Sequence, residues 1–255
     1  MLVMQSLTQR LANPSNFMAL SAQLLPWCWV VAAGLIGSGL YLAFFGSPPD
    51  YQQGQTVKIM YIHVPAAWLS MLIYTLIALS SFGLLVFRHP LADVSAKAAA
   101  PLGATFTFLA LATGSLWGKP MWGTFWVWDP RLTSVLILLF LYLGLIALRS
   151  SIEDEALAAK LTAVLSLVGI AILPVIKFSV EWNSLHQPAS VMRLGAPTIH
   201  ASLLWPLFVM ALGMTVLFTA LQLKAMRNEI LRRRVKALRR IAATSAADLS
   251  QQPAE

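Results

Sequence analysis

Residues 27–46 read WCWVVAAGLIGSGLYLAFFG and contain no charged side chain. About 20 consecutive apolar residues form a helix long enough to cross the hydrocarbon core of a bilayer. Five further stretches of this kind follow, at residues 59–87, 98–118, 132–148, 161–176 and 198–223. The sequence therefore predicts an all-α, polytopic membrane protein, a bundle of six transmembrane helices.

The composition of the chain agrees with this fold class. Among 255 residues, 58% are hydrophobic and 11% are charged, and the mean hydropathy is +0.71. A soluble domain carries roughly 25% charged residues, so this chain cannot cover a water-facing surface. A soluble enzyme, a disordered chain and a fibrous protein are excluded. We expect one integral membrane domain over residues 1–255, with the bundle at about 20–225 and a basic tail at 226–255.

The formal net charge of +8 is concentrated near the C-terminus, where eight of the eighteen basic residues fall between Lys224 and Arg240. A local cluster of this kind is typical of a cytoplasmic segment attracted to anionic lipid, not of a nucleic-acid-binding fold. We expect this tail to form a helix along the membrane surface, with residues 243–255 disordered. At the other end of the chain, Asn13-Pro14-Ser15-Asn16 predicts a turn between a short surface helix and the first span.

The distribution of basic residues predicts the orientation. An even number of spans places both termini on one side, and the tail and the turns at 88–97 and 149–160 are rich in lysine and arginine. The positive-inside rule then places both termini in the cytoplasm. The loops before the second span, after the third span and after the fifth span face outward, so their residues can meet.

The outward loop at residues 117–131 reads WGKPMWGTFWVWDPR. It holds Trp117, Trp122, Trp126 and Trp128, four of the nine tryptophans in the chain. Three explanations remain open: an aromatic belt at the membrane interface, packing of the loop on the bundle, and a platform for a flat aromatic ligand. The spacing of Trp122 and Trp126 predicts one shared helical face, and Gly118 and Gly123 would let a ligand approach the backbone.

Two outward elements carry histidine: His63 in YIHVPAAW, and His186 in EWNSLHQPAS. A lone histidine is more often structural than a ligand, but two of them beside a tryptophan platform favour haem, whose iron commonly takes histidine as an axial ligand. For His200, which also lies on the outward side, we favour an interfacial role, and His89 lies on the opposite side.

The charged residues near this loop have several possible roles. For Asp129 a helix cap and a role in orienting the loop or a partner are both open. The haem propionates could pair with nearby cations, without a spacing that selects one of them. These cations are Lys58, Lys119, Arg131 and Arg193.

The motifs that are absent also bear on the chemistry. The only cysteine is Cys28, so a CxxCH site for covalent haem attachment is excluded and haem would be held non-covalently. The sequence contains neither a P-loop nor HExxH, and we expect a protein that is not an enzyme.

The run Trp122-Gly123-Thr124-Phe125-Trp126-Val127-Trp128-Asp129 matches the WGxxWxWD signature, with WGKPMWG and DPRLTS around it. Together with YIHVPAAW and VEWNSLHQ, this run resembles the tryptophan-rich haem-handling family of cytochrome c maturation, over about residues 20–225. Many members of that family have tryptophan where this chain has Phe125, which also keeps a stacking face.

The resemblance implies a specific site and set of partners. The tryptophan loop with Trp117, Trp122, Trp126, Trp128, Asp129 and Arg131 would hold haem b at the periplasmic face of the bacterial inner membrane, with His63 and His186 as axial ligands. The haem would pass to the membrane-anchored chaperone CcmE, beside the ABC transporter subunits CcmA and CcmB and the small protein CcmD.

Two alternative functions remain at this point. One is a permease subunit of an ABC-type exporter, in which the spans form a route for haem; Pro174 and the Gly34–Gly39 stretch are the only signs of a break in a span. The other is a structural assembly subunit that binds no cofactor.

Overall fold

The computed structural model describes residues 13–182, 192–193, 196–197 and 199–250, and the side chains of 180–182, 192–197 and 246–250 are outside the description. Within these residues, six helices are long and apolar enough to cross a membrane, which confirms the predicted fold class. They cover Pro14–Gly46, Gln55–Phe87, Pro90–Trp122, Pro130–Ser151, Glu155–Ser179 and Ala201–Ser245.

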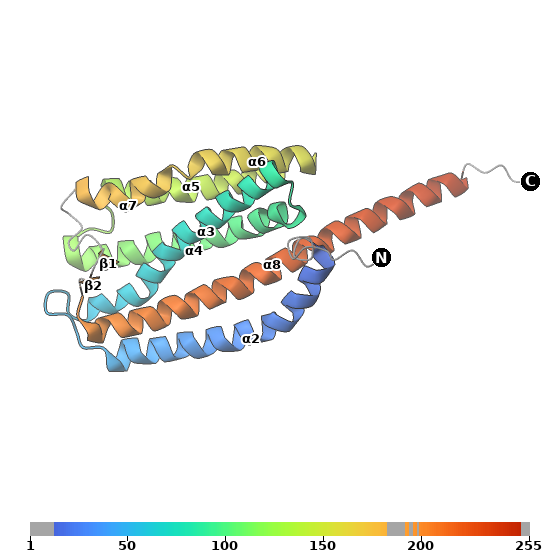
Figure 1. The fold of residues 1–255 in the computed structure, drawn as a ribbon. Coiled ribbons are helices and arrows are strands. Elements are labelled where there is room, and N and C mark those ends of the chain that lie inside the picture. Colours follow the sequence, from blue (N-terminus) through green and yellow to red (C-terminus); the bar gives the residue numbers. More distant parts are fainter. Residues whose placement is uncertain (1–12, 183–191, 194–195, 198, 251–255) are drawn as a thin grey trace, which may run out of the picture.

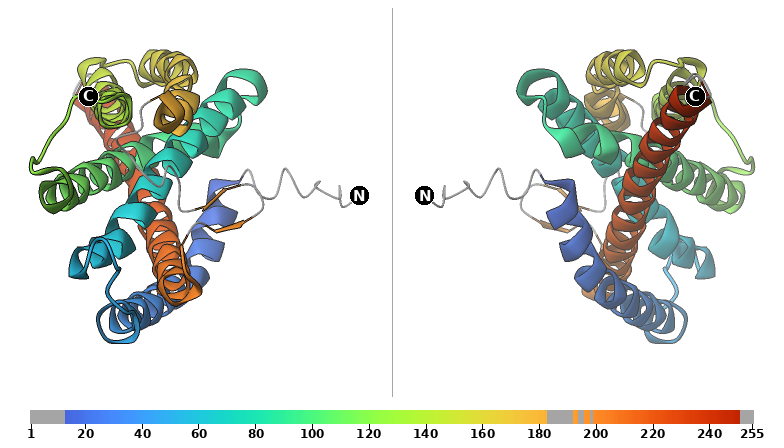
Figure 2. Two further views of the ribbon diagram at one scale, coloured as in Figure 1. Left: turned by 90° about the vertical axis from the view of Figure 1, so that its left-hand side faces the viewer. Right: turned by 90° about the vertical axis from the view of Figure 1, so that its right-hand side faces the viewer.

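The spans are built from these elements: α2 (Pro14–Tyr41), η1 (Leu42–Gly46), η2 (Gln55–Ile59), α3 (Met60–Phe87), α4 (Pro90–Trp122), α5 (Pro130–Ser151), α6 (Glu155–Gly169), α7 (Ile172–Trp182) and α8 (Ala201–Ser250). A short antiparallel hairpin precedes α8, and each of its strands has two residues: β1 (Met192–Arg193) and β2 (Ala196–Pro197). In the bundle α2 lies along α8 and α3 lies along α4 (Figures 1 and 2).

The first span begins earlier than the sequence predicted. Asn13 is the N-cap of α2, since its side-chain oxygen accepts a hydrogen bond from the Ser15 amide at 2.8 Å, and the helix continues without a break to Tyr41. The predicted turn at 13–16 is therefore a helix start, and the surface helix predicted before it lies outside the described residues. Pro26 lies inside α2, where its missing N–H bends the helix (Figure 1).

The fifth span is interrupted between α6 and α7, at Ile170 and Ala171. Pro174 explains the break, because its ring cannot donate to the carbonyl of the residue four positions earlier, which is Ile170. The break is closely packed: a Cβ added at Gly169 would lie 2.1 Å from the Tyr74 hydroxyl. The interruption predicted from Pro174 is present, but a side chain of α3 packs against it.

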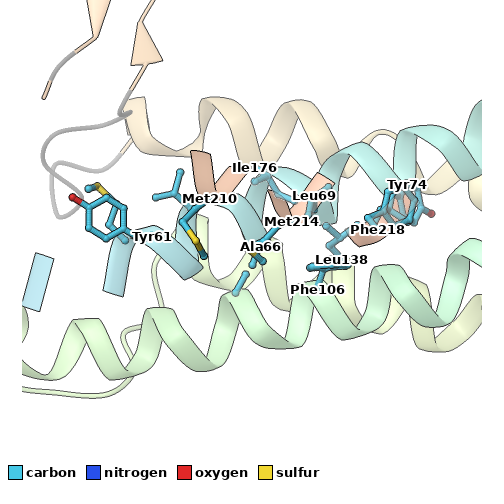
Figure 3. Packing of buried hydrophobic residues seen from close by; sticks show 14 of the residues in the cluster. Tyr61, Ala66, Leu69, Tyr74, Phe106, Leu138, Ile176, Met210, Met214 and Phe218 are labelled. Atoms are coloured by element: carbon cyan, nitrogen blue, oxygen red, sulfur yellow. The ribbon is translucent and has the colours of Figure 1, made fainter. Parts of the chain in front are cut away.

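The core of the bundle lies between α3, α4, α5 and α8 (Figure 3). Tyr74 and Tyr142 are fully buried, with ring centroids 5.2 Å apart. The Tyr142 hydroxyl donates a hydrogen bond to the Ser70 carbonyl at 2.6 Å. This bond satisfies a buried polar group that has no water to bond with inside the membrane. Gly103 of α4 makes room for this ring, because a Cβ there would lie 2.0 Å from the Tyr142 Cε1.

Replacing Gly103 by alanine is therefore expected to lower the free energy of unfolding by about 3 kcal/mol, as is typical of overpacking a core that cannot relax. Gly144 of α5 is the matched control, because nothing lies within 4 Å of a Cβ built there. Gly144→Ala is expected to be neutral or slightly stabilising. Thermal unfolding in detergent measures both variants. Equal melting temperatures for the two would contradict this account of Gly103.

At the end of the bundle away from the tryptophan loop, charged side chains join four helices. Arg149 of α5 holds Asp93 of α4 through two hydrogen bonds of 2.5 and 2.8 Å. Arg233 of α8 bridges Asp93 and Glu229, at 2.5 and 2.7 Å. The network also contains Lys97–Glu229, Arg232–Glu229 and Lys236–Glu155.

The structure corrects the prediction for the tail. α8 runs as one helix from Ala201 to Ser250, and beyond the bundle it projects away from it (Figure 1). No proline or glycine follows Gly213 within α8, so the tail continues the sixth span as one unbroken helix. Residues 243–250, predicted to be disordered, belong to this helix.

Candidate functional site

Two of the three predicted outward elements, the start of the second span and the tryptophan loop, lie at the same end of the bundle, because α3 and α4 are antiparallel. His63 lies in the first turn of α3 and Trp117 near the end of α4. The loop from Gly123 to Trp128 follows, and Asp129 leads into α5.

The hydrogen bonds of His63 define which of its nitrogens carries the proton. Its Nδ1 lies 3.0 Å from the backbone oxygen of Ala110 and 3.2 Å from the Thr113 hydroxyl. A carbonyl oxygen can only accept, so Nδ1 is the donor, and in the neutral form of the ring the lone pair then lies on Nε2. A histidine held by a backbone carbonyl in this way is oriented as metal-ligating histidines are.

Trp117 packs against this histidine with an edge-on geometry, and the two ring centroids are 5.6 Å apart. The Trp117 indole N–H donates to the Gln53 side-chain oxygen at 2.9 Å, which ties α4 to the loop before α3. Gly114 gives the imidazole its space, because a Cβ there would lie 2.9 Å from the His63 Cε1. Gln53 and Gly114 were not predicted as part of the site. Gly114 could have been suspected from its position three residues before Trp117, whereas no sequence signal marks Gln53.

The predicted helical pairing of Trp122 and Trp126 is wrong. α4 ends at Trp122, and Gly123 adopts a left-handed conformation with φ of 75° that closes the helix. Trp126 therefore lies in the loop and not one turn further along α4. The prediction for Gly118 is also corrected: a Cβ there would lie 3.0 Å from the Trp122 ring, so this indole covers the glycine.

A second aromatic pair forms in the loop itself. The rings of Trp126 and Trp128 meet edge-on, with centroids 5.5 Å apart. Trp128 is 74% exposed. The Trp126 Nε1 is buried and has no hydrogen-bond partner among the residues that the structure describes. The loop therefore offers one exposed indole face beside a partly buried indole.

Asp129 acts as the helix cap that was one of its two predicted roles. Its side-chain oxygen accepts from the Leu132 amide at 2.7 Å, and the residue is 2% exposed. Arg131, two residues later, is half-buried and interacts electrostatically with Asp129. This capped start holds the C-terminal end of the tryptophan loop in place.

Two of the nearby cations are hydrogen-bonded to backbone oxygens. Lys58 donates to the Phe44 carbonyl at 2.9 Å, and Lys119 donates to the Gly123 carbonyl at 2.9 Å. The Lys119 ammonium also lies 5.2 Å from the centre of the Phe125 ring. Because a lysine has three donors, each ammonium retains the capacity to bind an anion.

The other predicted residues are placed as follows. His186 lies outside the described residues, as does the side chain of Arg193. His200 precedes α8, where its Nδ1 accepts from the Ser202 amide at 3.3 Å, so it acts as a helix cap. His89 caps α4 at the opposite end of the bundle.

The fold and the site define a multi-pass membrane protein that carries a held histidine and an exposed aromatic loop at one end of its helix bundle. The family model described as heme exporter protein C matches residues 7–241, and the chain belongs to this family. Its predicted role in haem transport and cytochrome c biogenesis is thereby confirmed at the level of the family.

The similar proteins include several bacterial members of this family. The chain is 59% identical to the heme exporter protein C of Bradyrhizobium diazoefficiens, over 94% of this chain and 92% of the relative. It is 44% identical to that of Escherichia coli K12, over 87% and 90% of the two chains. The corresponding protein of Paracoccus denitrificans is 45% identical over 89% and 95%.

Proposed function

We propose that this protein binds haem b non-covalently at the tryptophan-loop end of its bundle and delivers it to the chaperone CcmE. The site faces the periplasm, both termini are cytoplasmic, and the protein lies in the bacterial inner membrane. It holds and presents its cargo and catalyses no reaction. The ABC subunits CcmA and CcmB and the small protein CcmD, which the family resemblance implies, act beside it.

The observation that carries this proposal is the hydrogen bond from the His63 Nδ1 to the Ala110 carbonyl. It leaves the lone pair on Nε2, the atom that a haem iron requires from an axial histidine. His63 therefore suits an axial ligand of haem, and His186, which lies outside the described residues, is the second ligand that we propose. A second axial histidine keeps the iron from reacting with oxygen while the haem is held.

The aromatic loop fits the porphyrin plane. Trp128 and Phe125 are 74% and 53% exposed, so their faces are available to a flat apolar ligand. Lys58 and Lys119 supply charges of the sign that the propionates need, and Arg131 and Arg193 are the other two candidates. An exposed site of this kind also suits transfer, since CcmE could dock over the loop and remove the haem when one histidine lets go.

The permease alternative gains no support from the interrupted fifth span, since the break between α6 and α7 is filled by Tyr74. A carrier that receives haem at its outer face needs no route between the spans. Uptake of haem into sealed vesicles by this chain together with its ATPase would instead favour the permease.

The absorption spectrum of the detergent-purified protein, with and without dithionite, tests the proposal. We expect a Soret band and bis-imidazole features, both lost in the variant that combines His63→Ala with His186→Ala. Unchanged features in that variant would refute axial ligation, and a colourless wild-type protein from haem-rich cells would favour the structural subunit. Reporter fusions at residues 63 and 186 test the orientation, because fusions on opposite sides of the membrane would rule out one shared site.

Gly114→Ala is expected to weaken haem binding about tenfold. This is the lower end of the loss in affinity of about 10–100-fold that follows when a group orienting a metal ligand is disturbed. The added methyl group would lie 2.9 Å from the His63 Cε1 and 3.3 Å from its Nδ1, and would displace the ring. Gly37→Ala is the control, because a Cβ there meets nothing within 4 Å. Haem titration of the apoprotein measures both. Equal affinity in the two variants would contradict the packing role of Gly114.

A further inference from the structure

The C-terminal part of α8 carries an exposed row of apolar side chains that no described part of the chain covers. Leu231, Val235, Leu238 and Ala242 follow one another at spacings of four, three and four residues, so they share one helical face. Leu231, Val235 and Leu238 are 45%, 46% and 65% exposed. We call these four residues the apolar stripe.

The stripe points away from the bundle. The face of α8 that packs on the other helices carries Glu229, Arg233 and Lys236, which form the ion pairs to α4 and α6. At about 100° per residue, Leu231 and Leu238 lie roughly opposite Glu229 and Arg233. The stripe is therefore not an incompletely buried edge of the bundle core.

We do not expect lipid to cover the stripe, because α8 is longer than a membrane span needs to be. Residues 201–223 span about 34 Å along the helix axis, enough to cross a hydrocarbon core of about 30 Å. Leu238 lies about 22 Å further along the axis, beyond a headgroup layer of about 5–8 Å. The helix is straight and projects from the bundle (Figure 1), so its outer part does not return to the membrane plane.

The charges beside the stripe select the occupant. The spacing is that of a coiled-coil seam, with Leu231 and Leu238 at d positions and Val235 and Ala242 at a positions. The flanking e positions then hold Arg232 and Arg239, and the g positions hold Arg234 and Ile241. In a parallel pair of two copies, Arg234 of one helix would face Arg239 of the other, and like charges oppose that pairing.

We propose that the apolar stripe is a docking site for an amphipathic helix of another protein, with leucine-type residues along its seam and glutamate or aspartate beside it. The apolar residues provide the contact area, and Arg234 and Arg239 provide the selection for an acidic partner, whereas Arg232 is already paired with Glu229. This site lies at the end of the bundle opposite the tryptophan loop. It does not depend on what that loop binds.

A designed probe tests this chemistry directly. The probe is a labelled peptide of about three heptads with Leu and Val along the seam and Glu at the flanking positions, and its counterpart has Lys there. Fluorescence anisotropy measures binding to the full chain in nanodiscs of neutral phosphatidylcholine. We expect the acidic peptide to bind at least about tenfold more tightly than the basic one, and less tightly as salt is added.

Two neighbouring substitutions add the same charge on different faces. Leu238→Glu is expected to weaken binding of the acidic peptide at least about tenfold, and Ala237→Glu less than about threefold. No binding of the acidic peptide, or an equal loss in both variants, would overturn the proposal.

Two other occupants of the stripe, a second copy of this chain and lipid, are tested with a single cysteine at position 238. The variant combines Leu238→Cys with Cys28→Ser. Oxidative cross-linking of two chains through this position would assign the stripe to a second copy. A blue shift of an environment-sensitive dye on it, when phosphatidylglycerol replaces phosphatidylcholine, would assign it to lipid. Either result overturns the proposal.

Discussion

Replacing His63 by alanine is expected to lower haem affinity by about 100-fold or more. Losing a residue that only orients a metal ligand costs about 10–100-fold, and the loss of the ligand itself should not cost less. The Ala110 carbonyl accepts the Nδ1 proton of His63 and so leaves the lone pair on Nε2. No other described side chain takes the place of His63 there. Haem titration of the purified apoprotein, followed at the Soret band, gives the affinity.

The control for this experiment is His89→Ala. His89 accepts a hydrogen bond from the Leu91 amide at the start of α4, at the opposite end of the bundle. Its removal costs a helix cap worth about 1 kcal/mol, without touching the haem site. If His89→Ala lost as much haem as His63→Ala, the effect would be one of folding, and the assignment of His63 as a ligand would fail.

Replacing Asp93 by alanine is expected to destabilise the bundle by about 3–5 kcal/mol, the usual cost of removing one member of a buried ion pair. The side chains of Arg149 and Asp93 are only 10% and 12% exposed, so removing the carboxylate leaves a largely buried charge without this partner. Arg149 loses both of its hydrogen bonds to Asp93, and Arg233 loses one of its two partners.

Glu153→Ala provides the comparison, because Glu153 is an exposed carboxylate in the short connection between α5 and α6. Its loss removes the same charge at the same end of the bundle and is expected to change stability by less than about 1 kcal/mol. Thermal unfolding in one detergent at one salt concentration measures both. A melting temperature for Asp93→Ala close to that of Glu153→Ala would show that the network contributes little.

The six spans were predictable because an uncharged stretch of about 20 residues has few alternatives to a membrane helix. The boundaries were less accurate. The first span extends back to Pro14, and α4 begins at Pro90 and includes Asp93 and Lys97, which the sequence placed in a turn. Hydropathy identifies the apolar part of a helix, but it does not identify the polar turns that continue it and pair with other helices.

The site was predictable in its composition and less so in its geometry. The cluster of tryptophans and His63 could be found because these residue types are uncommon together and suit one ligand. The spacing of Trp122 and Trp126 led to the wrong prediction of one shared helical face, because Gly123 ends the helix between them. Gly123 could have warned of this end, since glycine is common where helices stop.

What the sequence by itself determined is the class of the protein, its six spans and the loop that carries its aromatic residues. These follow from local physics, the length of apolar runs and the chemistry of indole and imidazole. Only the tertiary structure decided that the Ala110 carbonyl orients His63 and that Gly103 admits the ring of Tyr142. Each of these depends on which helix lies beside which, and pairings between residues some 40 or more positions apart leave no periodic trace in one sequence.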